Sequence, residues 1–376
     1  MQQYNKIIQT FLLSSTSILY PSDILIGGKV SLDTVYLHNA SGKDGGSNNS
    51  DQFFNANNIP INSKGENAEL ALTARNSKFW IKTRTAQENG KLLTSLLEVD
   101  FWGSSGNEKN SNSHNMRLRH AYFIYNGWTV GQTNSLFSSN IKPATLKKPV
   151  DDVFMRQPII SYEKKIKNQS FSLSFEEPES VIMTKEGKKV TVNDDRLPDI
   201  VIKYKKYQDW GEYSMATVLR QLRVNQNLDE DINDYTWGYG LNINNKIELN
   251  KNNTLSMGIV GGQGIGRYMA TSFFPGAIVT ENGKLETQLA WGGHIGNQYW
   301  INHDLQLNSA LGWIDSESIL KLDTVNKSAW SVHITLKYNL LKNLLLSTEY
   351  IHGTRTLQNE EYYSVDRAYL QATYSF

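Results

Sequence analysis

Apolar and polar residues alternate one by one in many short segments of this chain. The last segment shows the pattern most clearly. One of its faces carries Ala368, Leu370, Ala372, Tyr374 and Phe376, and the other carries Arg367, Tyr369, Gln371, Thr373 and Ser375. Successive side chains of a β-strand point to opposite faces, so this pattern predicts strands with one apolar and one wet side.

Sixteen such segments follow one another, and we predict that short and long connections alternate between them. Asn126-Gly127 marks a tight hairpin, and no segment shows a sustained helical repeat. Lipid cannot hydrogen-bond the edge of a sheet, so strands that cross a membrane must close into a barrel. The pattern therefore predicts an all-β, transmembrane antiparallel barrel of about sixteen strands, with short turns periplasmic and long loops extracellular. The predicted strands are 24–36, 79–86, 92–102, 116–125, 128–133, 156–165, 170–177, 198–207, 213–224, 235–245, 254–264, 287–296, 299–313, 329–338, 344–353 and 367–376.

The composition agrees with a barrel. Of the 376 residues 39% are hydrophobic and the mean hydropathy is −0.47, because a barrel hides polar side chains in its lumen. The 19 Tyr, 13 Phe and 9 Trp residues would supply interfacial girdles. The net charge of +1 argues against a nucleic-acid partner. The absence of cysteine excludes disulfides and thiolate metal sites, and we expect no cofactor.

The N-terminal residues 1–22 are interpreted as a signal peptide. Lys6 is followed by a short apolar stretch, although no small-x-small cleavage site ends it. A first strand or a plain start of the chain is the alternative. We expect the barrel to occupy residues 23–376.

A barrel of sixteen strands is too wide for side chains to fill its lumen. We therefore expect a water-filled channel, narrowed by the third long connection, 134–152. This loop begins with Leu136 and Phe137 and is stiffened by Pro143 and Pro149. The polar stretch 38–69 is too rich in Asn, Gly and Ser to form a core strand.

Basic residues on the wet faces are candidates for lining the channel. Arg117 and Arg119 share one face of their segment, and we place Leu118, His120, Tyr122 and Ile124 on the opposite, outward face. Glu98 and Asp100, across one hairpin, are expected to pair with the two arginines. A surplus of guanidinium groups at a narrow point favours anions, because arginine binds carboxylates in a bidentate manner. Lys82, Arg84, Arg156, Arg220 and Arg267 also fall on inferred lumen faces.

Other motifs predict no catalytic or metal site. GGQGIG at 261–266 lacks the βαβ frame of a dinucleotide loop. His303 and Asp304 would point to opposite faces of a strand. The same criterion leaves His294, His333 and His352 isolated.

Several segments resemble the DcaP family of trimeric outer-membrane porins, in the family's order. They are LEVDF at 97–101, RLRHAY at 117–122, GQTNSLF at 131–137, RQP at 156–158, RLPDIVIKY at 196–204, GQGIGRY at 262–268 and the terminal YSF. The resemblance implies a homotrimer of sixteen-stranded barrels in the outer membrane of a Gram-negative bacterium. It further implies passage of small anions, notably dicarboxylates, past an arginine-lined eyelet formed by Arg117, Arg119 and Arg156.

The chain departs from the family pattern at three places. Lys82 and Arg84 alone stand for an arginine-rich strand, Ser161 precedes Tyr162 where the family tends to have arginine, and we expect no coiled-coil stalk before the first strand. These departures leave the choice of solute open. Two other classes remain as alternatives: an outer-membrane barrel enzyme of the phospholipase or protease type, and a soluble secreted all-β binding protein.

Overall fold

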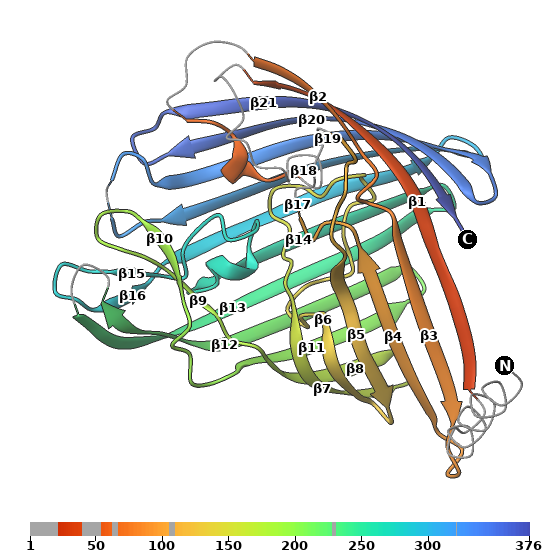
Figure 1. Cartoon of the computed structure of the whole chain (residues 1–376), viewed down its shortest axis with the longest axis horizontal. Coiled ribbons are helices and arrows are strands. Elements are labelled where there is room, and N and C mark those ends of the chain that lie inside the picture. Colours follow the sequence, from red (N-terminus) through yellow and green to blue (C-terminus); the bar gives the residue numbers. More distant parts are fainter. Residues whose placement is uncertain (1–21, 40–53, 62–66, 105–109, 228–230, 321) are drawn as a thin grey trace, which may run out of the picture.

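The chain forms one closed antiparallel β-barrel. The computed structural model describes residues 22–39, 54–61, 67–104, 110–227, 231–320 and 322–376. All but Ser22 of the predicted signal peptide 1–22 lies outside these residues, and Ser22 begins the first wall strand. In Figure 1 the C-terminus lies on the right, and the strands β9, β10, β15 and β16 extend at the opposite end.

In the described ranges seventeen strands make up the wall sheet, and they correspond to sixteen positions around the ring. β2 and β3 occupy one position, because both pair with β1 and are separated only by residues 74–77. β1 and β21 pair and close the ring. The prediction of about sixteen strands is confirmed. The wall strands are β1 (Ser22–Asn39), β2 (Asn67–Thr73), β3 (Lys78–Ala86), β4 (Leu92–Asp100), β5 (Arg117–Tyr125), β6 (Trp128–Asn134), β7 (Arg156–Ile166), β8 (Gln169–Glu176), β11 (Asp199–Gln208), β12 (Gly211–Asn227), β13 (Asp231–Asn250), β14 (Asn253–Gln263), β17 (Leu289–Trp300), β18 (Leu305–Glu317), β19 (Asn326–Leu341), β20 (Leu344–Leu357) and β21 (Tyr362–Ser375).

The alternation of side chains around the wall follows the predicted pattern. In β21, Ala368, Leu370 and Tyr374 are exposed outward, whereas Arg367 and Tyr369 are buried inside. Large apolar side chains also cover the outside of the other strands; Ile26 and Leu70, for example, are 68% and 66% exposed. A sandwich would bury such a face, so the closed ring excludes the alternative of a soluble sandwich.

The strict alternation of short and long connections was wrong on the extracellular side. β12 and β13 pair as far as Asn227 and Asp231, so only residues 228–230 join them. β20 and β21 are joined by residues 358–361 alone. The polar residues 225–234 lie between two of the predicted strands, yet most of them continue β12 and β13 as a long hairpin.

The boundary between β17 and β18 was also misplaced. Residues 299–313 were predicted as one strand, but β17 continues to Trp300 and residues 301–304 form the turn. His303 and Asp304 therefore lie in a turn, and His303 Nδ1 is 2.8 Å from Asp304 Oδ1. The expectation that these side chains cannot meet was wrong, because it assumed extended backbone.

A second, four-stranded sheet stands above the wall at the extracellular end. It consists of β9 (Ser180–Met183), β10 (Lys189–Val192), β15 (Ala277–Val279) and β16 (Leu285–Thr287). Its apolar side packs on Leu222, Val224 and Ile232 of the extended hairpin. These contacts explain why β12 and β13 continue beyond the predicted loop.

Two short 3-10 helices lie within the loops, η1 (Ala56–Asn58) and η2 (Gly266–Tyr268). No helix in the described ranges is long and apolar enough to cross a membrane. Both loops fold inward: Phe54, Ala56 and Ile59 are buried around η1, and Ile265, Tyr268 and Met269 around η2.

Candidate pore constriction

The connection between β6 and β7, residues 135–155 (L3 below), crosses the interior of the barrel. Its start is held by Glu176, whose Oε1 accepts a hydrogen bond from Leu136 N at 2.9 Å. Phe137 is fully buried, and its carbonyl accepts a hydrogen bond from Asn242 Nδ2 at 2.8 Å. The expectation that the third loop folds into the pore is confirmed.

The far end of L3 is fixed to the opposite wall. Val150 N donates to Ser331 Oγ at 3.0 Å, and Lys147 N donates to Glu349 Oε1 at 3.0 Å. Two wall glycines make room for the prolines: a Cβ at Gly296 would lie 2.7 Å from Pro143 Cβ, and one at Gly312 would lie 2.5 Å from Pro149 Cβ. The rigid part of L3 thus rests directly on β17 and β18.

Between L3 and the strands β5 to β7 lies a cavity of about 770 Å³, called the pore cavity below. Its lining is rich in cations. Arg117, Arg119 and Arg156 belong to the wall, and Lys142 and Lys148 belong to L3. Asp152 is the acidic residue in the lining. Other lining residues are Phe54, Asn55, Asn76, Asn134, Ser138, Ser139, Asn140, Pro143, Ala144, Pro149, Val150, Phe154, Ala270 and Thr271.

Two of the wall arginines are paired with acids of β4. Arg117 donates two hydrogen bonds to Asp100, from Nε to Oδ1 at 3.0 Å and from Nη2 to Oδ2 at 2.7 Å. Arg119 Nε lies 2.6 Å from Glu98 Oε1, and its Nη1 lies 2.8 Å from Asp100 Oδ2. Lys78 adds a third cation, 3.0 Å from Glu98 Oε2. The structure thus contains the pairs expected between the two strands.

Arg156 differs from these two arginines. Its guanidinium lies 5.0 Å from the centre of the Phe154 ring, and within the described part of the chain no carboxylate lies at ion-pair distance. Its Nε makes no hydrogen bond. Arg156 therefore presents an uncompensated positive charge to the pore cavity.

The L3 lysines face the arginines across this cavity. Lys142 is paired with Asp152, and Lys148 Nζ donates to the Pro143 carbonyl at 2.8 Å. Burial lowers the pKa of Lys148 to about 8, against the opposing effect of Asp152, and the cations Lys142 and Lys337 lower it further.

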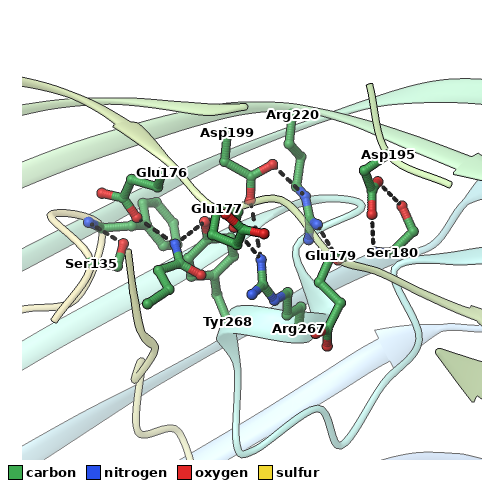
Figure 2. A network of polar contacts seen from close by, with 12 residues as sticks. Ser135, Glu176, Glu177, Glu179, Ser180, Asp195, Asp199, Arg220, Arg267 and Tyr268 are labelled. Atoms are coloured by element: carbon green, nitrogen blue, oxygen red, sulfur yellow. Dashed lines mark hydrogen bonds and ion pairs between the residues drawn. The ribbon is translucent and has the colours of Figure 1, made fainter. Parts of the chain in front are cut away.

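The remaining predicted residues lie elsewhere. Lys82 and Arg84 are in β3, opposite Leu96 and Thr94 of β4, and neither lines the pore cavity. Arg220 and Arg267 are buried against the inner wall. Figure 2 shows both arginines around Asp199: Arg220 Nε is 3.4 Å and Arg267 Nη1 is 3.7 Å from its carboxylate, and Tyr268 donates to it at 2.7 Å.

This buried network ties the η2 loop to the wall. Arg267 Nη1 donates to the Glu177 carbonyl at 2.9 Å, and Arg220 Nη2 donates to the Glu179 carbonyl at 2.6 Å (Figure 2). The η2 loop in turn holds L3, because Ala270 N donates to the Asp152 carbonyl at 3.1 Å. Arg220 and Arg267 thus help to position the constriction and do not line the pore cavity.

The outward face assigned to β5 was wrong for His120, Tyr122 and Ile124, which lie opposite Glu98, Leu96 and Thr94 on one face of β4. A bulge between Glu98 and Val99 leaves Arg119 without a partner in the ladder and sets His120 opposite Glu98. Because opposite residues share a face, His120 points into the lumen with Glu98. Leu118 does face outward and is 43% exposed. A bulge inserts one residue and so reverses the alternation, which a regular strand pattern cannot anticipate.

The prediction that three histidines are isolated was wrong as well. Each reaches an acid on another segment. His294 Nδ1 is 2.6 Å from Asp151 of L3, His333 Nδ1 is 3.2 Å from Glu349, and His352 Nδ1 is 2.9 Å from Asp366. Within the described ranges no group of three or more metal-binding side chains is found.

Some lining residues were missed by the sequence reasoning. Phe54 and Asn55 come from the polar stretch 38–69, and Ala270 and Thr271 come from the η2 loop. Aromatic residues in these loops could have indicated that the loops fold into the barrel. Phe54 lies in the polar stretch 38–69 and Phe273-Phe274 lie in the η2 loop, and large apolar side chains are commonly buried.

A family model described as a porin subfamily matches residues 45–370. The chain belongs to this porin subfamily. No curated protein matches it. Among solved structures, the outer-membrane channel DcaP of Acinetobacter baumannii is 21% identical, with a TM-score of 0.80, over 94% of this chain and 97% of that one. The anion-selective porin of Comamonas acidovorans is 12% identical, with a TM-score of 0.59, over 95% and 100%.

The trimer form of OmpT of Vibrio cholerae is a third similar structure. It is 8% identical with a TM-score of 0.57, over 94% of this chain and 99% of that one. At these identities the likeness shows the fold. Together with the family match, it makes this porin a channel of the Gram-negative outer membrane, as the resemblance implied.

Proposed function

We propose that this porin lets small hydrophilic anions diffuse through the outer membrane and that dicarboxylates are its preferred solutes. The observation that carries the proposal is the charge of the pore cavity. Five basic side chains and one carboxylate line it, and one of the five, Arg156, has no acidic partner in the described part of the chain. Water and salt screen charges only weakly in a narrow passage, so the surplus of positive side chains attracts anions.

The chemistry of the arginines favours carboxylates. Arg117 already holds the Asp100 carboxylate through two parallel hydrogen bonds, the geometry that guanidinium offers to planar anions. A solute carboxylate can approach the Arg156 guanidinium from the pore cavity, because no carboxylate of the described residues lies at ion-pair distance from it. The second carboxylate of the solute would face Lys148 on L3. A volume of about 770 Å³ accommodates such a small molecule together with water.

A comparison supports the sign of the selectivity. The Comamonas acidovorans porin, which has the same fold, is described as anion-selective. The family and the fold also favour a channel over a barrel enzyme.

We further propose that the barrel is a homotrimer embedded in outer-membrane lipid. The trimer form of the Vibrio cholerae protein shows that this fold can assemble in that way. The exposed apolar outer faces of the strands, such as Leu118 in β5 and Ile26 in β1, supply surfaces for lipid or for a neighbouring barrel.

The reversal potential in a salt gradient tests the selectivity. We expect the wild-type channel in a planar bilayer to prefer chloride over potassium, and the Arg156→Gln variant to lose part of that preference. Arg84→Gln is the matched control, because Arg84 is exposed and lies outside the pore cavity. A wild-type channel that prefers cations would refute the proposal.

A further inference from the structure

A second cavity lies on the other side of L3. It measures about 240 Å³ and is called the inner cavity below. Its roof is the L3 segment Thr145, Leu146 and Lys147, and its walls come from β1, β19, β20 and β21. The complete lining is Lys29, Asn76, Thr145, Leu146, Lys147, Lys337, Leu345, Ser347 and Gln371.

The inner cavity lies toward the periplasmic end of the barrel. Leu345 is the second residue of β20, directly after the short turn 342–343, and Lys29 pairs with Ser375 near the end of the chain. The pore cavity, by contrast, is lined by the first residues of β5 and β7, which follow extracellular loops. Asn76 lines both cavities, so the two are adjacent.

The lining of the inner cavity carries three ammonium groups and no carboxylate. Lys147 is paired with Asp33, which lies behind the lining, at 3.3 Å. Lys337 donates to the Ala144 carbonyl of L3. Lys29 has no carboxylate at ion-pair distance among the described residues. Glu349 also lies behind the lining, where it accepts hydrogen bonds from Leu146 N and Lys147 N. With Asp33 and Glu349 included, the three lysines leave a net charge of +1.

Neutral groups of the lining are also without partners. The hydroxyls of Thr145 and Ser347 are buried and make no hydrogen bond in the described part of the chain. Both oxygens are covered by protein atoms, so the polar contacts open to a ligand come from the ammonium groups of the lining. Asn76 and Gln371 both donate their amide groups to Asp33 and so hold this carboxylate away from the cavity.

We propose that the inner cavity is a second binding site for small dicarboxylates, which they occupy after passing L3. Its lining offers three ammonium groups to the two carboxylates of a solute, and its volume is roughly a third of that of the pore cavity, 240 against 770 Å³. Two successive binding sites of moderate affinity promote the flux of the solute, because each binds it strongly enough to admit it and weakly enough to release it. This inference rests on the proposed anion preference and extends it to the periplasmic side.

Succinate block of chloride current tests the proposal. Succinate is added to one side of the bilayer and then to the other. The orientation of the inserted channels is determined with the Glu186→Cys variant, whose cysteine is exposed and the only one in the sequence. A membrane-impermeant thiol reagent added to one side of the bilayer labels it only when it faces that side. The Lys29→Gln variant should raise the half-blocking concentration from the periplasmic side about three- to tenfold and leave the extracellular value nearly unchanged. Lys29→Arg should retain the wild-type value.

Lys82→Gln is the control, since Lys82 lies on the neighbouring strand and lines neither cavity. A Lys29→Gln channel with unchanged periplasmic block would overturn the second site. An equal change from both sides would also overturn it, because Lys29 would then act through the field of the whole pore. The anion preference of the wild-type channel is measured separately by its reversal potential. If the wild type shows no such preference, the proposed function itself is refuted. Acetate serves as the monoanion, and a Lys29 effect as large for acetate as for succinate would contradict the preference for a dianion.

Discussion

Single residues set the charge of the constriction, and their partners decide how much of that charge a solute meets. Arg117 and Arg119 are compensated by Asp100 and Glu98, whereas Arg156 is not. The paired arginines therefore hold the wall in shape and at the same time neutralise two carboxylates that would otherwise face the lumen.

Replacing both Arg117 and Arg119 with alanine should shift the channel toward cations. The double variant removes two positive charges, uncovers Asp100 and leaves Glu98 with Lys78 alone, so we expect the anion-to-cation permeability ratio to fall about tenfold. Reversal potentials measure the shift, and liposome swelling with succinate should slow in parallel. Adding Glu98→Gln and Asp100→Asn to the double variant should restore most of the preference, since the net charge then equals that of the wild type. An unchanged potential in the double variant would mean that the pairs contribute only to the wall.

Lys148 should make the selectivity depend on pH. Its pKa, lowered to about 8 by burial and by the neighbouring cations, lies below the ordinary value of lysine. The side chain is charged below this pH and loses its charge as the pH rises through it. We therefore expect the anion preference to decline between about pH 7 and pH 9. The Lys148→Arg variant should flatten this part of the curve, because arginine stays charged; an equally steep curve in that variant would assign the titration to another group.

At the scale of elements, L3 is positioned by contacts from both directions. β17 and β18 support its prolines from the wall, and the η2 loop holds Asp152 from the extracellular side. The width of the passage thus depends on residues that do not touch a solute.

The Gly312→Ala variant should displace L3. The added methyl group would lie 2.5 Å from Pro149 Cβ, so the loop or the wall must move, at a cost of roughly 1–3 kcal/mol. We expect altered single-channel conductance with a barrel that still folds. Gly261→Ala is the matched control, because the nearest atom to its methyl group would be 3.3 Å away. Equal conductance in both variants would show that L3 tolerates the displacement.

Removing Asp199 should loosen the η2 loop. The Asp199→Ala variant leaves Arg220 and Arg267 buried without their shared carboxylate (Figure 2), and breaking such a buried group typically costs about 3–5 kcal/mol. We expect the folded band on semi-native electrophoresis to disappear at a lower temperature than in the wild type. Asp209→Ala, in an exposed periplasmic turn, should leave that temperature unchanged.

At the scale of the whole molecule, ring closure and the outer surface determine where the protein resides. β1 completes the sheet by pairing with β21 on one side and with β2 and β3 on the other. The first and last strands of the wall thus pair with each other, and the apolar outer faces fit the membrane interior.

The proposed homotrimer can be tested on the solubilised protein. We expect chemical cross-linking in mild detergent to give dimer and trimer bands, and native mass spectrometry to give three times the mass of the denatured monomer. Heating before cross-linking is the control and should leave monomer alone. A monomer in mild detergent without heating would contradict the proposal.

The sequence by itself determined the class of fold and the strands. Alternation is a local property, since each side chain points away from its neighbours, so β21 and most wall strands were recognisable from their own residues. The pairs of Arg117 and Arg119 with Glu98 and Asp100 were predictable too, because one hairpin brings β4 and β5 together. The inward fold of L3 could be anticipated from its place in the chain and its prolines.

Only the tertiary structure decided what depends on contacts between distant segments. The bulge at Arg119 turned His120 inward, and packing on the extracellular sheet extended β12 and β13 beyond the predicted loop. Arg156 and Arg220 are both arginines on inferred lumen faces, yet one meets the pore cavity and the other is buried beside Asp199. The difference arises because loops from remote parts of the chain cover one and leave the other open. The inner cavity joins residues as far apart as Lys29 and Gln371, a proximity that exists only after the ring has closed.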